Sequence, residues 1–450
     1  MSILQLAWRN IIKNPLNLLM SIILFGLGVG LISFLLLFNH QLKDKFDKNL
    51  AEIDLVVGAK GSPLQMILCN MYHVDNPTGN IPIKNAAPLL KDLHPLIKKA
   101  IPLSLGDNFK TYRIVGTNHD FPALYEAKLN EGKLWAKDFE VTIGKSVAEE
   151  TGLKLGDKFV SSHGFNADDH THDEQSFVVV GILEGTGAVV DQLILTNTAS
   201  IWLVHAGHGD EAEHDESEEN HNHEAEGHEG HAHEDHAHEE NEQTGDNHEH
   251  GDSHLHDNSN SDLLHHQEQE ITSVLIQYKS RTNFQALNFG RNINENTEMQ
   301  AASPAIEINR LYNMIGVGTE ALRWLAILIA MVSALSIFIS LFKSMRERKY
   351  ELAIIRVLGA GRIKVFMLII LEGLILAIIG FLIGTALSHI GMELVAKYLK
   401  ADFRYSFTGW KFLDEEWWVL GVSLILGIIA SIIPAIQAAN TDINKTLSQK

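Results

Sequence analysis

The sequence has 450 residues, and its 36 basic and 56 acidic side chains give a formal net charge of −20 at pH 7. The acidity is local, because residues 205–270 hold 22 acidic side chains and no Lys or Arg, which leaves 36 basic against 34 acidic side chains elsewhere. The net charge therefore says little about the partners of the rest of the chain, and we expect no nucleic-acid partner. Cys69 is the only cysteine, which excludes an intrachain disulfide and a zinc site built from several cysteines.

The first apolar run, residues 18–38, contains no charged side chain and is long enough to cross a bilayer of about 30 Å. It is too long for the apolar part of a signal peptide, and no small-x-small cleavage site follows it, so we expect an uncleaved membrane span. Arg9 and Lys13 in residues 1–17 predict a cytoplasmic N-terminus.

The following residues, 39–320, mix strand-like and helix-like segments on the outer side of the membrane. We expect strands near residues 54–57, 111–116, 140–143, 157–161, 177–183, 192–196 and 271–278, and helices near residues 84–100, 145–156 and 284–315. This mixture predicts a large α+β extracytoplasmic domain of two subdomains, inserted between the first and second spans.

One segment of this domain, residues 205–270, has almost no apolar side chain to bury and is predicted to be a disordered insertion. It holds 16 of the 24 histidines. Alternating histidines beside carboxylates suit Zn²⁺ or another divalent transition metal, whereas the alternative is a solvated tether. The metal-binding candidates are His221, His223, His231, His233, His236, His238, His248, His250, His254 and His256.

Two smaller groups also contain metal-binding side chains. Met66, Cys69, Met71 and His73 lie in a turn-rich stretch and offer soft ligands for Cu(I) or zinc, although packed helices and hairpins often have this composition. A second polar loop contains His163, His170 and His172 with Asp168, Asp169 and Asp173, and here a solvated hairpin tip is the favoured interpretation.

After the outer domain the sequence alternates apolar runs with polar segments. We predict spans at residues 321–342, 365–390 and 417–433, a cytoplasmic basic segment at 343–364, a short outer loop at 391–416 and a cytoplasmic tail at 434–450. Four spans with both termini inside agree with the positive-inside rule, because the largest loop is then outside and the most basic loop inside. The whole is predicted to be a multi-pass protein of the bacterial cytoplasmic (inner) membrane.

The basic segment has the spacing of an amphipathic helix. Tyr350, Ile354 and Val357 share one side of that helix, and Gly359 and Gly361 allow the chain to turn after it. A cytoplasmic amphipathic helix between two spans is the part of the chain best placed to meet a cytoplasmic partner.

Two features lie inside the predicted spans. Gly26 and Gly30 have GxxxG spacing, as do Gly380 and Gly384. This spacing either brings two helices close together or reflects the general abundance of glycine in membrane helices.

Glu372 is a carboxylate within the third span, where an ionised side chain is costly. We expect it to pair with Arg346, Arg356 or Arg362 rather than to relay protons. No phosphate-binding loop, serine nucleophile elbow or HExxH motif is visible, so we expect no enzyme activity in this chain and neither ATP nor a cofactor bound by the fold.

The basic segment also carries a family signature. The sequence ERKYELAIIRVLGAGRIKV, followed by Glu372, resembles the R-x-x-E-x-x-x-x-R-x-x-G-A pattern of FtsX-like ABC permeases of the MacB/LolC/LolE type, in the type VII ABC superfamily. The opening AWRNIIKNP resembles the amphipathic helix that begins such permeases, here within residues 1–17. The tail PAIQAANTDINKTL resembles their ending, except that Ile443 stands where proline is usual.

This resemblance implies a permease homodimer or heterodimer with two cytoplasmic ABC ATPase subunits, in contact with membrane lipid and with room for a periplasmic partner protein. ATP binding would close the ATPase pair, and long helices near residues 306–322 and after Phe38 would carry that motion to the outer domain, without substrate crossing the helices. The implied ATPase-coupling residues are Arg346, Arg348, Glu351, Arg356, Gly359 and Ala360.

Three functions fit these features. The first is a permease that drives efflux or envelope transport, linked to zinc through the histidine-rich insertion. The second is a regulator that acts on a cell-envelope hydrolase or a signalling partner without transport, and the size of the outer domain favours the first over it. The third is a metal-buffering membrane protein, against which the well-formed basic segment argues.

Overall fold

The structure, a computed structural model, describes residues 3–12, 15–162, 171–206, 259–403 and 407–441. The chain divides into two compact units. Residues 1–50 and 305–450 form a helical unit, and residues 51–304 form an α+β unit inserted between its first and second long helices. The predicted fold class, four membrane helices with an inserted α+β domain, is confirmed.

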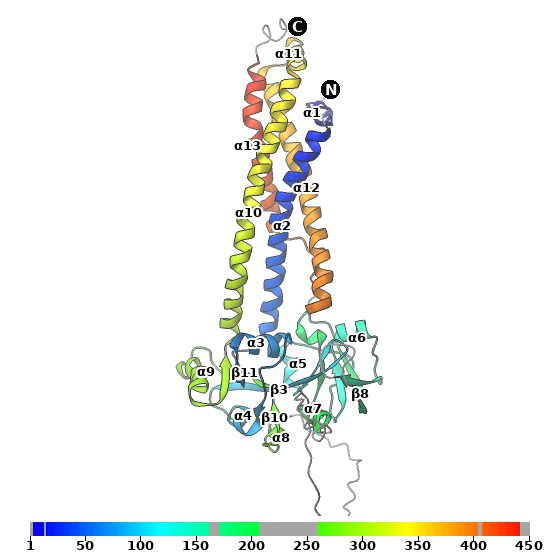
Figure 1. Ribbon diagram of the computed structural model, residues 1–450, viewed down its shortest axis with the longest axis vertical. Helices are drawn as coiled ribbons and strands as arrows, with labels where there is room; N and C mark the ends of the chain where they lie inside the picture. Colours follow the sequence, from blue (N-terminus) through cyan, green and yellow to red (C-terminus); the bar gives the residue numbers. More distant parts are fainter. Residues whose placement is uncertain (1–2, 13–14, 163–170, 207–258, 404–406, 442–450) are drawn as a thin grey trace, which may run out of the picture. The chain divides into compact units, whose positions relative to one another are not determined.

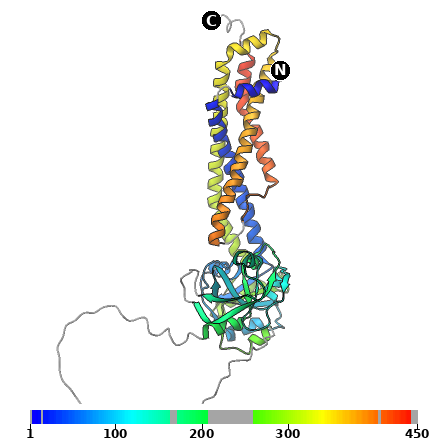
Figure 2. The ribbon, with the colours of Figure 1, turned by 90° about the vertical axis from the view of Figure 1, so that its right-hand side faces the viewer.

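Six helices make up the described part of the helical unit (Figure 1). They are α1 (Ile3–Ile12), α2 (Pro15–Leu50), α10 (Pro304–Glu347), α11 (Lys349–Val357), α12 (Arg362–Phe403) and α13 (Glu415–Ala439). Among them α2, α10, α12 and α13 are long and apolar enough to cross a membrane. Figure 2 shows the short α1 lying across the end of the bundle where α11 is found.

Three of these helices are much longer than a bilayer is thick, and α12, with 42 residues, is one of them. α10 has 44 residues, which is about 66 Å of helix at 1.5 Å per residue, against about 30 Å of hydrocarbon. α2 has 36 residues and runs without interruption from the apolar run through the polar residues after Phe38. The helical extensions expected near residues 306–322 and after Phe38 are therefore present as continuous helix.

The two GxxxG pairs meet where α2 packs against α12. A Cβ added to Gly384 would lie 2.6 Å from the Gly26 oxygen and 2.9 Å from the Gly30 nitrogen. A Cβ added to Gly380 would lie 2.5 Å from the Phe25 ring. Only glycine permits the two backbones to approach this closely, so the spacing does mark a helix–helix contact.

The α+β unit is built on one ten-stranded sheet with the strand order β12-β1-β11-β3-β4-β9-β6-β8-β5, in which β7 pairs with β3 and β8. Its strands are β1 (Leu55–Ala59), β3 (Ile97–Phe109), β4 (Tyr112–Thr117), β5 (Leu129–Gly132), β6 (Glu140–Ile143), β7 (Lys158–Ser162), β8 (Thr171–Leu183), β9 (Ile194–Thr196), β11 (Ser273–Tyr278) and β12 (Met299–Ala302). Strands β4 and β9, and β6 and β8, are parallel, and the other pairs are antiparallel.

Short elements connect and cover this sheet. They are α3 (Pro63–Tyr72), α4 (Ile83–Leu90), α5 (Asp120–Leu124), α6 (Lys145–Thr151), the 3₁₀ helix η1 (Val189–Gln192), α7 (Thr198–Ala206), α8 (Asn260–Leu263) and α9 (Phe284–Asn296), with a two-stranded ribbon of β2 (Ile81–Pro82) and β10 (Glu270–Ile271). The ordered α7 and α8 reach into both ends of the predicted insertion, residues 205–270.

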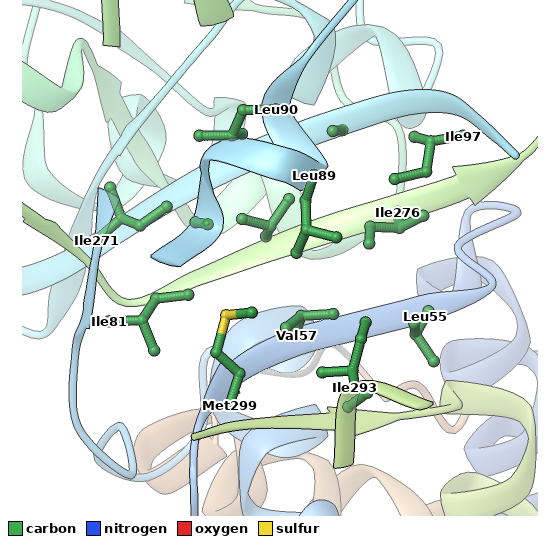
Figure 3. Close-up of a cluster of buried hydrophobic side chains, with 14 of the residues drawn as sticks. Leu55, Val57, Ile81, Leu89, Leu90, Ile97, Ile271, Ile276, Ile293 and Met299 are labelled. Atoms are coloured by element: carbon green, nitrogen blue, oxygen red, sulfur yellow. The ribbon is translucent and has the colours of Figure 1, made fainter. Parts of the chain in front are cut away.

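Two separate hydrophobic cores lie within this one unit. Figure 3 shows the first, in which Leu55 and Val57 of β1 meet Ile293 of α9 and Met299 of β12. The second is formed by another set of buried side chains, including Ile114, Val141, Phe159, Phe177 and Val179. The two predicted subdomains thus correspond to two cores that share a continuous sheet.

The strand predictions agree with the structure, but two of the helix predictions are partly wrong. Residues 97–100 begin strand β3 instead of continuing a helix. Pro95 disfavours a helical conformation at the residue before it, and the backbone N–H groups of Leu96 and Ile97 donate hydrogen bonds to the His94 ring. The predicted helix 284–315 is divided by β12, which pairs with the edge of β1. At residues 299–302, pairing with the distant strand β1 therefore outweighs the local preference for helix.

The glycine contact between α2 and α12 yields a matched test. Gly384→Ala should lower the free energy of unfolding by about 1–3 kcal/mol, because the added methyl group overlaps backbone that has no room to move. Gly421→Ala in α13 is the control, since a Cβ there meets nothing within 4 Å. Thermal unfolding of the purified protein in detergent would contradict this contact if both variants behaved alike.

Candidate functional site

The predicted cytoplasmic helix is a separate short helix, α11, joined to α10 at Arg348. Arg348 has φ −105° and ψ 17°, which redirects the chain between the two helices while backbone hydrogen bonds continue on both sides. The segment is anchored at each end in a membrane helix, so movement of α11 acts on both α10 and α12.

The end of α11 is a Schellman motif. Gly359 has φ +101°, its N–H donates to the Arg356 carbonyl, and the Ala360 N–H donates to the Ile355 carbonyl. The expected turn at Gly359 is confirmed, and only glycine adopts this conformation without strain. Gly359 and Ala360, for which the family resemblance implies a role in ATPase coupling, are also the residues that end the helix.

A buried ion pair lies directly behind α11. The Arg348 guanidinium donates to both oxygens of Glu372 on α12, at 3.1 and 3.3 Å, and the Asn10 amide of α1 donates to the same carboxylate at 2.8 Å. Arg348 is 7% exposed and Glu372 only 2%. Two charges removed from water in this way are stable only as partners, so the pair ties α1, α12 and the α10–α11 junction together.

The expected partners of Glu372 are thereby corrected. Arg346 points elsewhere, with its guanidinium 5.6 Å from the centre of the Phe342 ring, and Arg356 donates to the Thr441 carbonyl. Arg362 is exposed. The preference for a structural ion pair over a proton relay fits the geometry, but the arginine in that pair is Arg348.

A signal for this pairing was present in the sequence. Leu341, Met345 and Leu352 are buried, and their spacing continues through Arg348, so the arginine occupies a core-facing position of a helix. A charged side chain at such a position requires a buried counter-charge. The pattern of Tyr350, Ile354 and Val357 alone does not identify this position.

The opposite face of α11 is apolar and exposed. Tyr350, Ile354, Val357 and Leu358 are 43%, 38%, 61% and 82% exposed, whereas Leu352 and Ala353 are buried against the rest of the unit. Glu351 is also exposed. We call Tyr350, Ile354, Val357 and Leu358 the docking face. An exposed apolar face of this kind on a short helix is typical of a protein contact.

A second buried pair lies near the other end of α12. The His389 ring contacts the Gly409 carbonyl through Nδ1 and Glu416 of α13 through Nε2, at 3.2 Å. Gly409 in turn donates its N–H to Glu393, at 2.9 Å. These contacts fasten the segment before α13 onto α12, so both ends of α12 are held by buried polar contacts. The sequence analysis did not identify this pair.

The metal candidates divide into two groups, one outside and one within the described residues. The ten histidines of the insertion, together with His163 and His170, lie outside the described residues. Met66, Cys69, Met71 and His73 are buried in or at the end of α3. Within the described ranges, no three His, Cys, Asp or Glu side chains are grouped so as to hold a metal ion.

The surroundings of α3 disfavour a cation. The Arg113 guanidinium donates to the Cys69 Sγ at 3.4 Å, so a positive charge already occupies the position beside the thiol. Burial raises the pKa of Cys69, which keeps the thiol protonated. Burial and, secondarily, the Arg113 charge lower the pKa of His73 to about 3. Side-chain packing is the better interpretation of this group.

Two family models match the sequence. One, described as FtsX-like permease C-terminal, matches residues 324–443, and the other, described as MacB-like periplasmic core domain, matches residues 18–214. Among curated proteins, none matches significantly. Among solved structures, the periplasmic region of MacB from Actinobacillus actinomycetemcomitans matches with 10% sequence identity and a TM-score of 0.31, over 59% of this chain and 95% of that chain. The first matched range contains α11, Arg348 and Glu372.

The buried ion pair predicts strong non-additivity. Glu372→Leu should lower the free energy of unfolding by about 3–5 kcal/mol, because it leaves the Arg348 guanidinium buried without its carboxylate. The double variant Arg348→Met with Glu372→Leu should recover most of this loss. The three variants are Glu372→Leu, Arg348→Met and the double variant. Denaturing them in the same detergent measures the coupling free energy between Arg348 and Glu372.

The control is Glu295→Leu, which removes the partner of Arg291 in an exposed pair at 2.7 Å on α9 and should change stability little. If the double variant lost as much stability as the two single losses added together, Arg348 and Glu372 would not act as a pair.

His73 predicts an acid-sensitive α+β unit. A folded-state pKa of about 3 lies below the ordinary value of about 6.5, so the unfolded chain binds the proton first as the pH falls. Between pH 7 and pH 5 this difference in proton binding lowers the free energy of unfolding by about 2 kcal/mol. Asparagine tolerates the left-handed φ of 52° at this position, so His73→Asn should make the free energy of unfolding depend less on pH. His265→Asn, on the exposed surface, should leave that pH dependence as it is. If the free energy of unfolding changed with pH in the same way in the native protein and in both variants, His73 would not be the source of the acid sensitivity.

Proposed function

The chain belongs to the FtsX/MacB type of ABC permeases, and from this membership we propose that it converts ATP hydrolysis in a separate ATPase subunit into movement of its α+β unit. The family is one of permease subunits, which are generally not enzymes themselves. The long apolar helices make it an inner-membrane protein. In this proposal its substrate is moved by the outer domain and does not pass between the helices.

The docking face is the observation that carries the proposal. Its four apolar side chains point away from the helical unit, while Leu352 and Ala353 hold α11 against it. The face lies between two spans in the most basic segment of the chain, which places it in the cytoplasm by the positive-inside rule. A groove on an ATPase subunit would cover these side chains.

The buried contacts supply the route by which movement spreads. A shift of α11 changes the direction of α10 at Arg348 and pulls on α12 through Glu372. α2 ends at Leu50 and α10 begins at Pro304, which are the points where the chain enters and leaves the α+β unit. Rigid helices continuous with that unit transmit displacement over their whole length.

Two further elements complete the proposal. With α11 in the cytoplasm and four spans, we infer that both termini lie in the cytoplasm and the α+β unit lies outside. The exposed apolar side chains of α10, such as Met331, Leu335 and Ile339, suit contact with lipid or with a second permease subunit, so the working unit is a homodimer or heterodimer.

Divalent-metal handling is the finer part of the proposal. It is supported by composition alone, since residues 205–270 combine 16 histidines with 22 acidic side chains. Neutral imidazole at pH 7 binds zinc without a preformed cage. Zinc is the expected ion, and the histidine-rich segment is its expected point of capture.

The docking face gives the direct test of ATPase coupling. Val357→Asp and Leu358→Asp should each abolish co-purification with the ATPase subunit, because a carboxylate would be buried in an apolar contact. Phe284→Asp on α9 is the matched control, since Phe284 is also an exposed apolar side chain but lies in the α+β unit.

The measurement is pull-down of the co-expressed ATPase from detergent-solubilised membranes, with thermal unfolding to show that each permease variant is folded. Retention of the ATPase by both aspartate variants would overturn the assignment of the docking face.

A further inference from the structure

The short helix α1 carries an exposed apolar stripe on its outer side. Leu4, Trp8 and Ile12 follow one another at intervals of four residues and are 58%, 49% and 51% exposed. Residues four apart are neighbours on one face of a helix, so these three side chains form a continuous surface. We call them the α1 stripe.

The opposite side of α1 is built into the helical unit. Ala7 is fully buried and belongs to the same apolar cluster as Leu352 of α11. The Asn10 amide donates to the Glu372 carboxylate at 2.8 Å. One side of α1 is therefore attached to the coupling helix and to the buried ion pair, whereas the α1 stripe faces away from both.

The position of α1 in the chain places the stripe at the depth of the lipid headgroups. Only residues 13–14 separate α1 from α2, and α2 begins at Pro15, which is three residues or about 4.5 Å of helix before the uncharged run starts at Leu18. Figure 2 shows that α1 lies across the end of the bundle instead of continuing along the spans. A helix in this orientation lies within the headgroup layer, which adds roughly 5–8 Å to each side of the hydrocarbon.

Lipid already covers the neighbouring surface. Leu19 and Ile23, in the first turns of α2 that belong to the predicted span, are 54% and 44% exposed apolar side chains. The exposed apolar surface therefore continues from α1 onto a membrane helix within a few residues. The same solvent, the acyl chains of one leaflet, suits both parts of this surface.

The charges around the stripe favour anionic lipid. Arg9 is exposed beside Trp8, and Lys13 follows Ile12 in the sequence. Residues 1–17 contain no acidic side chain. A helix with tryptophan and leucine on one face and basic side chains beside it binds between headgroups and acyl chains, and the lipid phosphates neutralise the basic groups.

We propose that anionic lipid binds along the α1 stripe and thereby strengthens the attachment of α1 to Glu372 and to the cluster around Leu352. A ligand that binds the folded arrangement stabilises it, and here the ligand is the charged leaflet at this end of the bundle. Lipid charge then regulates how firmly α11 is tied to α12. This regulation rests on the proposed function, whereas the binding of lipid does not.

The first test locates the stripe in the full-length permease alone, in nanodiscs of phosphatidylglycerol. Leu4→Cys and Ile12→Cys each carry a spin label, and the native Cys69 is buried. Both labels should collide often with oxygen, which dissolves in hydrocarbon, and rarely with a water-soluble nickel chelate. A label at Leu358→Cys, on the exposed docking face, is the control and should show the opposite preference.

Three results of this first test would overturn the proposal. Labels on α1 that meet the nickel chelate as often as the control label does would lie in water. Labels shielded from both reagents would be covered by a second copy of the chain. Labels that become shielded only after the ATPase subunit is added would belong to the ATPase contact.

The second test measures the effect of lipid charge on stability. Exchange of phosphatidylcholine for phosphatidylglycerol in the nanodiscs should raise the Tm of the permease by a few degrees, and Arg9→Gln should remove a large part of this rise. Arg362→Gln is the matched control, because it removes an exposed positive charge at the start of α12 and leaves α1 intact. It should keep most of the rise.

Equal losses in Arg9→Gln and Arg362→Gln would show a general attraction between basic residues and the leaflet, without a binding surface on α1, and would overturn the proposal. No rise in the native protein would overturn it as well. Both measurements are made without an ATPase subunit, so they succeed or fail independently of the proposed ATPase coupling.

Discussion

The helical unit depends on one buried ion pair. Arg348 and Glu372 are both nearly inaccessible to water, and neither charge is stable there without the other. Because Arg348 is also the residue at which α10 gives way to α11, the pair fixes the direction of the short helix relative to α12. Asn10 adds α1 to the same carboxylate. A hydrophobic contact would hold these helices as firmly but would not fix their register.

The glycine contacts explain why movement at this pair would spread. α2 meets α12 through facing glycines, and α12 meets α13 through Gly373 and Gly427, where an added Cβ would lie 2.9 or 3.0 Å from backbone oxygen. Backbones in direct contact leave no flexible side chains to absorb a displacement. His389 and Glu416 fasten the other end of α12 to α13. These contacts couple α2, α12 and α13 closely to one another.

Periodicity and charge were enough to predict the spans and most of the strands, because these depend on neighbours close in sequence. The turn at Gly359 was predictable for the same reason. The strand at Met299–Ala302 was not, since it depends on pairing with β1 far away in the chain. The GxxxG spacing left a helix–helix contact open as one of two interpretations, since the facing glycines lie far apart in the chain. The partner of Glu372 was missed, although the buried positions around Arg348 carried the signal. The contact of His389 with Glu416 joins α12 to α13 and also has no local pattern.

We propose that Arg348 and Glu372 transmit ATP-driven movement. Val317 on α10 and Tyr398 on α12 are both about three-quarters exposed, so each can be replaced by a cysteine that carries a spin label. The native Cys69 is buried and should not be labelled. The two labels then report the distance between α10 and α12. In the complex with its ATPase, ATP should change this distance in the otherwise native protein. Glu372→Gln should keep the ATPase bound but abolish the change. An identical ATP-dependent change in both proteins would contradict the account.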